Sequence, residues 1–261
     1  MVEADEVSDD SRLVQNPGQL RGARAALTVV VPLFEEAANA PALAEALRAF
    51  SSTERALRPV EIVLVDDGSR DTTAALLAEL GPTIPARVLT HAENQGLTAA
   101  LLTGSGAATT ELIGWLDGDL TYPPAILGGL AQACDDGADV ATASCYHPDG
   151  AVEGVPRWRL CLSRGASLLH RLTSGARLHT FTCMVRVQRR ATLLASVPDR
   201  GGFVGVTEWL LRALRAGSRV VEVPAVLRLR VGGRSKMRVL RVALRHLGLA
   251  LANLTGRLRP R

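Results

Sequence analysis

Aromatic residues make up only 3% of this 261-residue sequence. Proteins that bind single-stranded nucleic acid stack the bases on aromatic rings, so nucleic acid is not expected as a partner. No run of about eighteen apolar residues occurs, so the sequence predicts no membrane-spanning helix. The acidic start MVEADEVSDD is also unlike a secretory leader, which is basic and then apolar. We therefore expect a cytoplasmic protein.

Cysteine is scarce as well. The four cysteines form no C-x-x-C pair, which is typical of reduced core or site residues in a cytosolic protein. Cys145 and His147 could supply half of a metal site, but no second half accompanies them in the sequence. We therefore predict no metal site at these two residues.

Lysine occurs once, at Lys236, whereas arginine occurs 29 times. Residues 1–150 hold 8 Arg and 22 acidic residues, a net charge of −14, and residues 151–261 hold 22 basic and 4 acidic residues, a net charge of +18. This asymmetry indicates that the second half contacts something anionic; on charge alone, nucleic acid, a phosphorylated substrate and a membrane surface all qualify. A compact ammonium group kept at one position of an arginine-rich chain favours a functional role for Lys236.

Apolar runs alternate with helical patterns through the first half of the chain. The runs at 27–34, 60–69, 86–91 and 112–117 predict buried strands, and helices are predicted between them. This alternation indicates an α/β fold, a single Rossmann-like domain with a mostly parallel central sheet. We expect a flexible tail at 1–25, a catalytic domain at 26–237 and a basic amphipathic helix at 238–261. Ligands of such sheets bind at the carboxyl ends of the strands.

Known classes of α/β site leave motifs at these strand ends. A dinucleotide-binding domain needs a glycine-rich first turn, whereas that turn is VPLFEE here, and a phosphate-binding P-loop is also absent from the sequence. The stretch WLDGDLT fits the motif of haloacid-dehalogenase-type phosphatases, in which Asp117 would be the nucleophile. Those phosphatases carry the motif on their first strand, but three predicted strands precede it here. The phosphatase is kept as an alternative.

Asp117 and Asp119 flank Gly118 at the end of the fourth predicted strand. In an extended segment, residues two apart project to the same side, so the two carboxylates would repel each other unless a cation lies between them. A hard divalent cation held by carboxylates can bridge the diphosphate of a sugar nucleotide and stabilise the charge on the leaving group. The motif therefore predicts a Mg²⁺ or Mn²⁺ site with Asp117 and Asp119 as ligands.

Six motifs occur in the order found in one enzyme family. The chain from about Leu27 to Met237 resembles the inverting family 2 glycosyltransferases of the glycosyltransferase-A fold, particularly the dolichyl- and polyprenyl-phosphate mannosyl- and glucosyltransferases. The matching segments are VVVPLFEE, EIVLVDDGSRD, NQGLTAALLTG, LDGDLTYPP, RLCLSRGASLL and VVEVPAVLRLRVGGRSKM. The resemblance implies transfer of a sugar from a nucleoside-diphosphate donor, UDP- or GDP-linked, by a single in-line displacement with inversion.

The resemblance also implies roles for individual residues. The pocket for the nucleoside and ribose would be lined by Pro32, Phe34, Glu36, Val65 and Asp67. Asp117 and Asp119 would ligate the metal, with Gly118 against the donor. Arg230 and Lys236 would clamp the diphosphate, so Asp119 and Lys236 are predicted to be catalytic.

Arg159 and Ser163 match the motif that faces the acceptor phosphate in the lipid-phosphate enzymes, so a polyprenyl phosphate is the expected acceptor. Arginine suits this task because its planar fork binds phosphate oxygens bidentately. A soluble hydroxylated acceptor is the alternative, and it would need a general base, for which Glu208 is the candidate. A sugar-nucleotide-binding protein without activity is a further alternative.

The chain departs from the family at several positions. Cys145 stands where the family usually has an arginine, and Thr180 and Met184 replace an aspartate and a glycine. These changes leave the expected fold and chemistry in place, but they leave the sugar and the acceptor undetermined.

After the last motif, leucines recur at spacings of three and four. They are Leu240, Leu244, Leu247, Leu251, Leu254 and Leu258. Arginines lie off this stripe and no acidic residue occurs in the segment, a pattern typical of a helix in the headgroup layer of an anionic membrane. In this interpretation the protein is peripheral at the inner face of the cell membrane. In the alternative, the same leucines pack on the catalytic domain or on a second subunit of a homo-oligomer.

Overall fold

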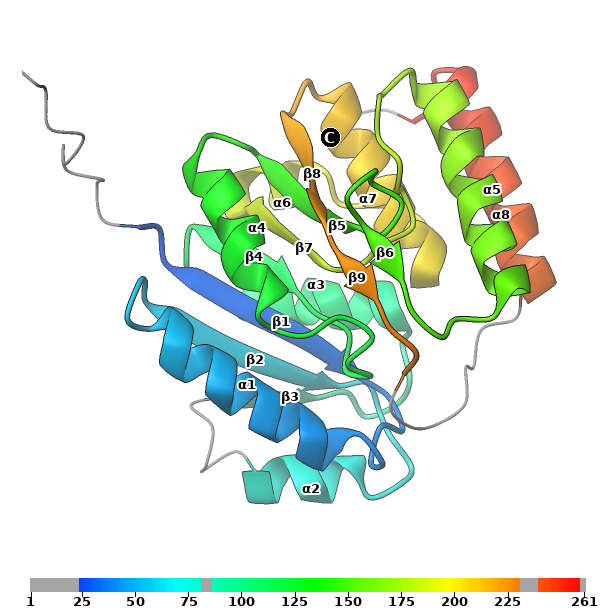
Figure 1. Ribbon diagram of the computed structural model, residues 1–261. Coiled ribbons are helices and arrows are strands. Elements are labelled where there is room, and N and C mark those ends of the chain that lie inside the picture. Colours follow the sequence, from blue (N-terminus) through cyan, green and yellow to red (C-terminus); the bar gives the residue numbers. More distant parts are fainter. Residues whose placement is uncertain (1–23, 81–85, 231–238, 259–261) are drawn as a thin grey trace, which may run out of the picture.

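A computed structural model describes residues 24–80, 86–230 and 239–258 of the chain. Within them, one mixed sheet forms the centre of the molecule (Figure 1). Its strands are β1 (Leu27–Leu33), β2 (Val60–Asp66), β3 (Ala86–Thr90), β4 (Leu112–Trp115), β5 (Val140–Ser144), β7 (Arg186–Arg189) and β8 (Val220–Pro224). Their spatial order is β3-β2-β1-β4-β7-β5-β8.

The strands around β1 are parallel to one another: β1 pairs with β2 and β4, and β2 pairs with β3. β7 runs antiparallel to β4 and β5, whereas β5 and β8 are parallel. β1 and β2 are rich in valine, leucine and isoleucine and are buried along almost their whole length, as strands covered on both faces must be. The predicted α/β domain with a mostly parallel central sheet is confirmed.

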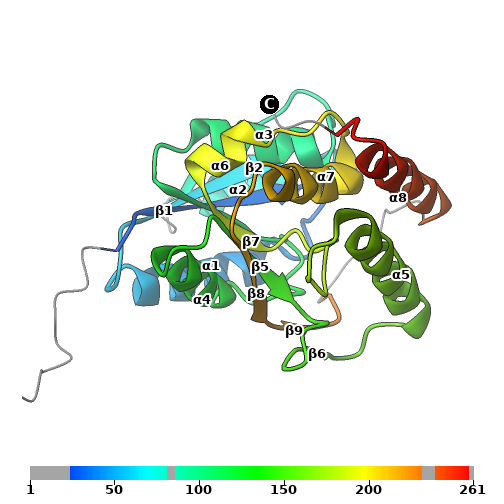
Figure 2. The same ribbon diagram turned by 90° about the horizontal axis from the view of Figure 1, so that it is seen from above.

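Helices cover both faces of this sheet (Figure 2). α1 (Ala40–Glu54) and α4 (Ile126–Asp135) lie on one face, and α3 (Leu97–Ala107), α6 (Arg190–Ala195) and α7 (Gly202–Arg215) lie on the other. α2 (Thr73–Leu80) packs beside α1 near β3. Each face has its own cluster of buried side chains, with Leu47 and Leu127 in one and Leu101 and Trp209 in the other.

α5 (Arg157–Ser174) and α8 (Val239–Leu254) lie side by side at one end of the molecule (Figures 1 and 2). The His170 Nε2 atom of α5 and the His246 Nδ1 atom of α8 are 3.0 Å apart. The Asn253 side chain donates a hydrogen bond to the Thr173 carbonyl at 3.0 Å. The helix expected at the C-terminal end is therefore present, and one of its faces is buried against α5 and α7.

The opposite face of α8 is apolar and exposed. It carries Leu244, Leu247, Leu251 and Leu254, with relative exposures of 48–62%, and we call these four residues the leucine face. Leu258, expected on the same stripe, lies beyond the end of the helix and is buried in the cluster that contains Leu249. The side chain of Leu240 lies outside the described part. None of the helices in the described ranges is long and apolar enough to cross a membrane.

A second, two-stranded sheet consists of β6 (Ala151–Val152) and β9 (Val226–Leu227), which pair in parallel. It joins the segment that precedes α5 to the segment that follows β8. Both segments border the cavity described next, so this small sheet positions one of its walls.

Candidate active site

The carboxyl ends of β1, β2 and β4 meet at one edge of the sheet. Leu33 pairs with Asp66, and the Asp67 amide donates to the Leu33 carbonyl at 2.8 Å. The chain leaves β4 through Leu116 into the Asp-Gly-Asp turn. A Cβ atom at Gly118 would lie 2.4 Å from the Leu33 side chain, so a larger residue here would force Leu33 at the end of β1 to move.

Two residues beside these strand ends have a left-handed backbone. Glu35 has φ 50° just after β1, and Leu120 has φ 58° just after Asp119. Residues other than glycine rarely adopt this conformation, and such strain concentrates at ligand sites. The turns after β1 and β4 are therefore candidates for substrate contact.

These turns open into a cavity of about 680 Å³. The cavity is lined by ten of the residues predicted from the sequence to form the site: Pro32, Phe34, Glu36, Asp67, Asp117, Gly118, Asp119, Arg159, Ser163 and Arg230. They come from three strand ends, from α5 and from the segment after β9. Tyr146 and Phe203 also line the cavity and were not predicted to belong to the site; Tyr146 follows β5, and Phe203 lies in the first turn of α7.

Charged groups gather at the base of this cavity. The Arg230 guanidinium donates to Glu36 Oε1 at 3.0 Å and lies 3.6 Å from Asp119 Oδ2. Burial, together with the carboxylates of Asp119 and Glu36, raises the pKa of Asp117 to about 8, and the nearby charge of Arg230 opposes this rise. Asp117 is therefore mostly protonated at neutral pH when no cation other than Arg230 is near.

The donor set fits a hard divalent metal ion. Carboxylate oxygens are the ligands that Mg²⁺ and Mn²⁺ prefer, and a metal ion would allow Asp117 to ionise. No three His, Cys, Asp or Glu residues in the described part of the chain converge as a complete metal site. Asp117 and Asp119 alone would leave coordination positions for a diphosphate or water.

Two arginines of the cavity wall have unused hydrogen-bond donors. The Nε atoms of Arg159 and Arg230 are buried and have no hydrogen-bond partner among the described residues. A buried donor without an acceptor costs free energy, so both side chains favour an anion in the cavity. Arg159 comes from α5 and Arg230 from the segment after β9, so oxyanions could be bound from two different elements.

Asp67 orders the segment that leads into α3. Its carboxylate accepts the backbone amides of Gln95 at 2.9 Å and Gly96 at 2.8 Å, and it lies 2.7 Å from His91 Nδ1. Asn94 and Gly96 of this segment line the cavity. The motif NQGLTAALLTG signalled this segment in the sequence, but its residues were not assigned to the site.

Val65 does not line the cavity. It lies in β2, is fully buried and belongs to the cluster under α3. A Cβ atom at Gly104 of α3 would lie 3.0 Å from Val65, which shows how closely the helix covers it. The sequence indicated a residue at the end of β2, but only Asp67 of this strand end projects into the cavity.

Glu208 also lies away from the cavity, and Lys236 lies outside the described residues. The Glu208 side chain is completely buried. It accepts the backbone amides of Asp199 and Arg200, both at 3.1 Å, and the guanidinium groups of Arg200 and Arg212. A carboxylate whose oxygens are so fully engaged fixes the loop before α7 and is not placed to take a proton from an acceptor.

The residues that depart from the family lie behind the cavity wall. Burial raises the pKa of the Cys145 thiol, which accepts a hydrogen bond from Tyr122. The Thr180 hydroxyl is 2.8 Å from that of Ser144, and Met184 packs in the cluster around Trp115. Behind this wall, neutral Cys145 and Thr180 thus stand where the family has an arginine and an aspartate, and Met184 stands where it has a glycine.

The family model for glycosyl transferase family 2 matches residues 28–193. A polyprenol monophosphomannose synthase of Mycolicibacterium smegmatis is 33% identical over 231 residues, which is 85% of this chain and 84% of that protein. The chain belongs to glycosyl transferase family 2. The family resemblance predicted from the motifs is confirmed, and the protein is a glycosyltransferase, so the phosphatase alternative is set aside.

Two further relatives are longer than this chain. A dolichol-phosphate mannosyltransferase of Pyrococcus furiosus is 30% identical across 81% of this chain and 59% of its own length. An undecaprenyl-phosphate 4-deoxy-4-formamido-L-arabinose transferase of Pseudomonas paraeruginosa is 34% identical across 67% of this chain and 50% of its own length. The chain therefore spans only half to three fifths of these two relatives.

Solved structures share the fold. A glucosyl-3-phosphoglycerate synthase of Mycobacterium tuberculosis, in complex with Mn²⁺, uridine diphosphate and glucosyl-3-phosphoglycerate, superposes with a TM-score of 0.67. The alignment covers 89% of this chain and 80% of that protein at 17% identity. At this identity the likeness establishes the glycosyltransferase-A arrangement alone.

Proposed function

We propose that this glycosyltransferase moves a sugar from a nucleoside-diphosphate sugar to a polyprenyl phosphate, with inversion at the anomeric carbon. The observation that carries the proposal is that the buried Nε donors of Arg159 and Arg230, in the wall of one cavity, have no hydrogen-bond partner within the part of the chain that the structure describes. A transfer between a diphosphate and a phosphate needs two oxyanion sites. The named relatives act on lipid phosphates, which supports this acceptor.

On the donor side, Arg230 would bind the diphosphate, and Glu36 and Asp119 hold its guanidinium in place. Asp117 and Asp119 would hold Mg²⁺ or Mn²⁺. The metal ion, when bound, supplies positive charge that stabilises the leaving nucleoside diphosphate. Asp117 would lose its proton on forming this site, and Gly118 lets the backbone approach the donor closely.

On the acceptor side, Arg159 and Ser163 would bind the lipid phosphate. The Ser163 hydroxyl is 2.9 Å from that of Thr182, which fixes its position on the cavity side of α5. A phosphate acceptor is ionised at neutral pH and attacks without a general base. This agrees with the burial of Glu208, the candidate general base, away from the residues that line the cavity.

The same helix would present the lipid. α5 exposes Trp158, Leu162, Leu168 and Leu172, and α8 beside it exposes the leucine face. Neither helix contains an acidic residue, and both carry exposed arginines. We infer that these two helices rest on an anionic membrane surface, with the apolar residues among the acyl chains and the arginines at the phosphates.

The test is a transfer assay in which UDP- and GDP-linked sugars are each offered with polyprenyl phosphate, with the matching polyprenol, and with no acceptor. The proposal expects product only with the phosphate, and Arg159→Ala should raise the KM for it by one to two orders of magnitude, since about 1.5–3 kcal/mol of charge-assisted binding is lost. Transfer to the polyprenol or to soluble alcohols, with none to the phosphate, would overturn it.

A further inference from the structure

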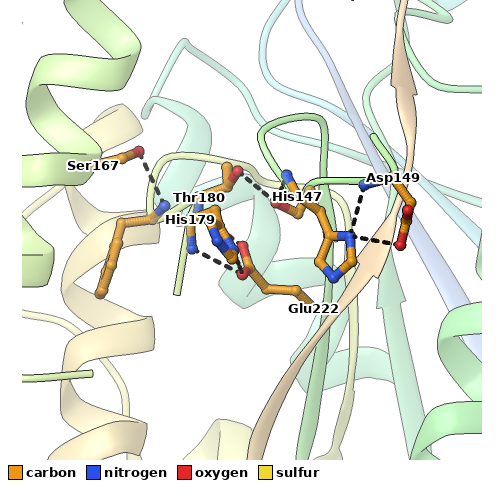
Figure 3. A network of polar contacts seen from close by, with 8 residues as sticks. His147, Asp149, Ser167, His179, Thr180 and Glu222 are labelled. Atoms are coloured by element: carbon orange, nitrogen blue, oxygen red, sulfur yellow. Dashed lines mark hydrogen bonds and ion pairs between the residues drawn. The ribbon is translucent and has the colours of Figure 1, made fainter. Parts of the chain in front are cut away.

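The structure brings together two histidines that are 32 residues apart in the sequence. His147 follows β5 and His179 precedes β7, and their ring centroids are 5.7 Å apart with an interplanar angle of 72°. Both rings are accessible, with side-chain exposures of 27% and 35%. Figure 3 shows them in one network of polar contacts near Glu222. The sequence around Cys145 and His147 showed no further metal ligand, and the fold places a second imidazole, that of His179, beside His147.

His179 is held in a fixed orientation by Glu222 of β8. Its Nδ1 atom lies 2.8 Å from Glu222 Oε2, and the same carboxylate accepts the backbone amides of His179 and Thr180, each at 2.8 Å (Figure 3). A carboxylate at Nδ1 keeps the proton on that atom, so Nε2 carries a free lone pair. Metal-binding histidines have this arrangement, in which an outer carboxylate orients the ring and makes it more basic.

His147 is positioned by Asp149 in a different way. The Asp149 amide donates a hydrogen bond to His147 Nδ1 at 3.2 Å, so Nε2 carries the proton in this conformation, and Asp149 Oδ2 lies 3.5 Å from Nδ1. A metal ion at Nε2 would select the other tautomer, in which Nδ1 gives up the hydrogen bond from the Asp149 amide and its proton points to the nearby Asp149 carboxylate. No hydrogen bond engages Nε2 of either ring within the residues that the structure describes.

We propose that His147 and His179 form a two-histidine site for a divalent transition-metal ion of the Zn²⁺, Cu²⁺ or Ni²⁺ type. Two imidazoles that share a tetrahedral ion at about 2.0–2.1 Å have ring centroids roughly 5–6 Å apart, which matches the observed separation. Imidazole nitrogen suits these ions, whereas the carboxylates Asp117 and Asp119 suit Mg²⁺ and Mn²⁺. Because no third protein ligand converges on the pair in the described ranges, water completes the coordination.

A bound ion would join two segments that border the active site. His147 is next to Tyr146, which lines the cavity, and the segment from His179 runs to Thr182, which contacts Ser163. The ion would therefore tie the connection after β5 to the connection before β7. We expect Zn²⁺ to raise the melting temperature of the protein, because an ion that binds only the folded state stabilises it by mass action.

The test is Zn²⁺ titration calorimetry on the full chain in excess Mg²⁺, which occupies the carboxylate site. A Cys161→Ser background removes the exposed thiol, the other ready transition-metal ligand among the described cysteines. We expect one Zn²⁺ per chain, an affinity more than about tenfold weaker in His147→Gln and in His179→Gln, and no change in Asp119→Asn. Both histidine variants should melt like the background protein in chelator, since the rings are partly exposed.

A second measurement identifies the ligands. Cu²⁺ bound to the background protein should give an electron paramagnetic resonance spectrum with hyperfine coupling to two imidazole nitrogens, and each histidine variant should reduce this to one or none. Glu222→Gln should weaken Zn²⁺ binding by about 10- to 100-fold while both histidines remain. Zn²⁺ binding that is absent from the background protein, or that persists unchanged in both histidine variants, would overturn the proposal.

Discussion

Asp117 is held at the edge of the sheet in a state that disfavours its charge. Burial and the carboxylates of Asp119 and Glu36 raise its pKa from 3.8 to about 8. Between these two pH values the folded chain binds one proton more than the unfolded chain, so the metal-free protein loses stability as the pH rises from about 4 to about 8. Ionisation of Asp117 in the folded protein at neutral pH is thus favourable only when a cation binds beside it.

We therefore expect the affinity for Mn²⁺ to rise about tenfold per pH unit up to about pH 8 and then to level off, because each binding event releases the Asp117 proton. Calorimetry in the presence of a nucleoside diphosphate at several pH values measures this. Asp117→Asn should abolish Mn²⁺ binding at this site. The same change should stabilise the metal-free protein at neutral pH by roughly 1–4 kcal/mol. If Asp117→Asn were less stable than the parent protein, the buried Asp117 carboxyl group would not be the destabilising feature of the metal-free site.

The charge of Arg230 is expected to act on the diphosphate of the donor and not on its nucleoside. Its guanidinium is held by Glu36 and lies near Asp119, and its Nε donor has no hydrogen-bond partner in residues 24–80, 86–230 and 239–258. Arg230→Met should weaken nucleoside-diphosphate binding by about 1.5–3 kcal/mol, which is one to two orders of magnitude, and leave nucleoside binding nearly unchanged. Equal losses for both ligands in a competition assay would show that Arg230 does not contact the diphosphate.

At the scale of single elements, the contact between α5 and α8 depends on two neutral histidines. Burial lowers the pKa of His170 to about 3 and that of His246 to about 4, assisted by their proximity and by Arg245. Both rings are neutral in the folded protein and would become charged below about pH 6.5 in the unfolded chain. This part of the stability is therefore complete above pH 6.5 and is lost as the pH falls towards 4.

Hydrogen exchange should detect this loss. Between pH 7.5 and pH 5, after correction for the intrinsic rate, amides of α8 should lose protection before those of β1 and β2. His246→Gln keeps a side chain that can hydrogen-bond His170, and it should flatten the pH dependence in α8. A pH profile that is equally steep in the variant would mean that other groups control the docking of α8.

The elements differ in how far the sequence could predict them. β1, β2 and β4 are short apolar runs whose ends carry the motifs, so their edge of the sheet followed from pattern alone. β6 and β9 are only two residues long, and β7 is a polar-looking RVQR segment in which Arg186 is buried. No periodicity marks such strands. They form because long-range pairing satisfies their backbone groups.

The site residues divide in the same way. Those on strand ends were expected at one edge because parallel strands bring their motifs together, whereas the roles of Arg159 and Ser163 on α5 came from the family resemblance alone. Glu208 could not be placed, since its partners Asp199 and Arg200 lie in a loop and its helical register alone does not show whether a buried acid is paired. The proximity of His147 and His179 could not be foreseen either, because it depends on β7 lying next to β5.

For the whole molecule, the placement of the two exposed helices has the largest consequence. α5 has Arg159 and Ser163 on the cavity side and Trp158 and Leu162 exposed to solvent. α8 extends this apolar surface with its leucine face, although half of that helix is already used for packing. A helix that needed only to pack on the domain would not need a second apolar face, so a lipid surface accounts for the pattern better than burial within one chain does.

The last prediction tests this surface without disturbing the fold. Leu247→Glu combined with Leu251→Glu changes side chains that are 48% and 54% exposed, so the melting temperature should stay nearly the same. Co-sedimentation with anionic liposomes at low salt should be lost, together with most transfer to polyprenyl phosphate in vesicles, while nucleotide-sugar binding persists. Leu57→Glu is the matched control, because Leu57 is 50% exposed just beyond α1. If the control and the double variant sediment alike, the leucine face does not contact the membrane. A second chain would then be its partner, and a shift in oligomeric state of the double variant, measured by ultracentrifugation, would identify that arrangement.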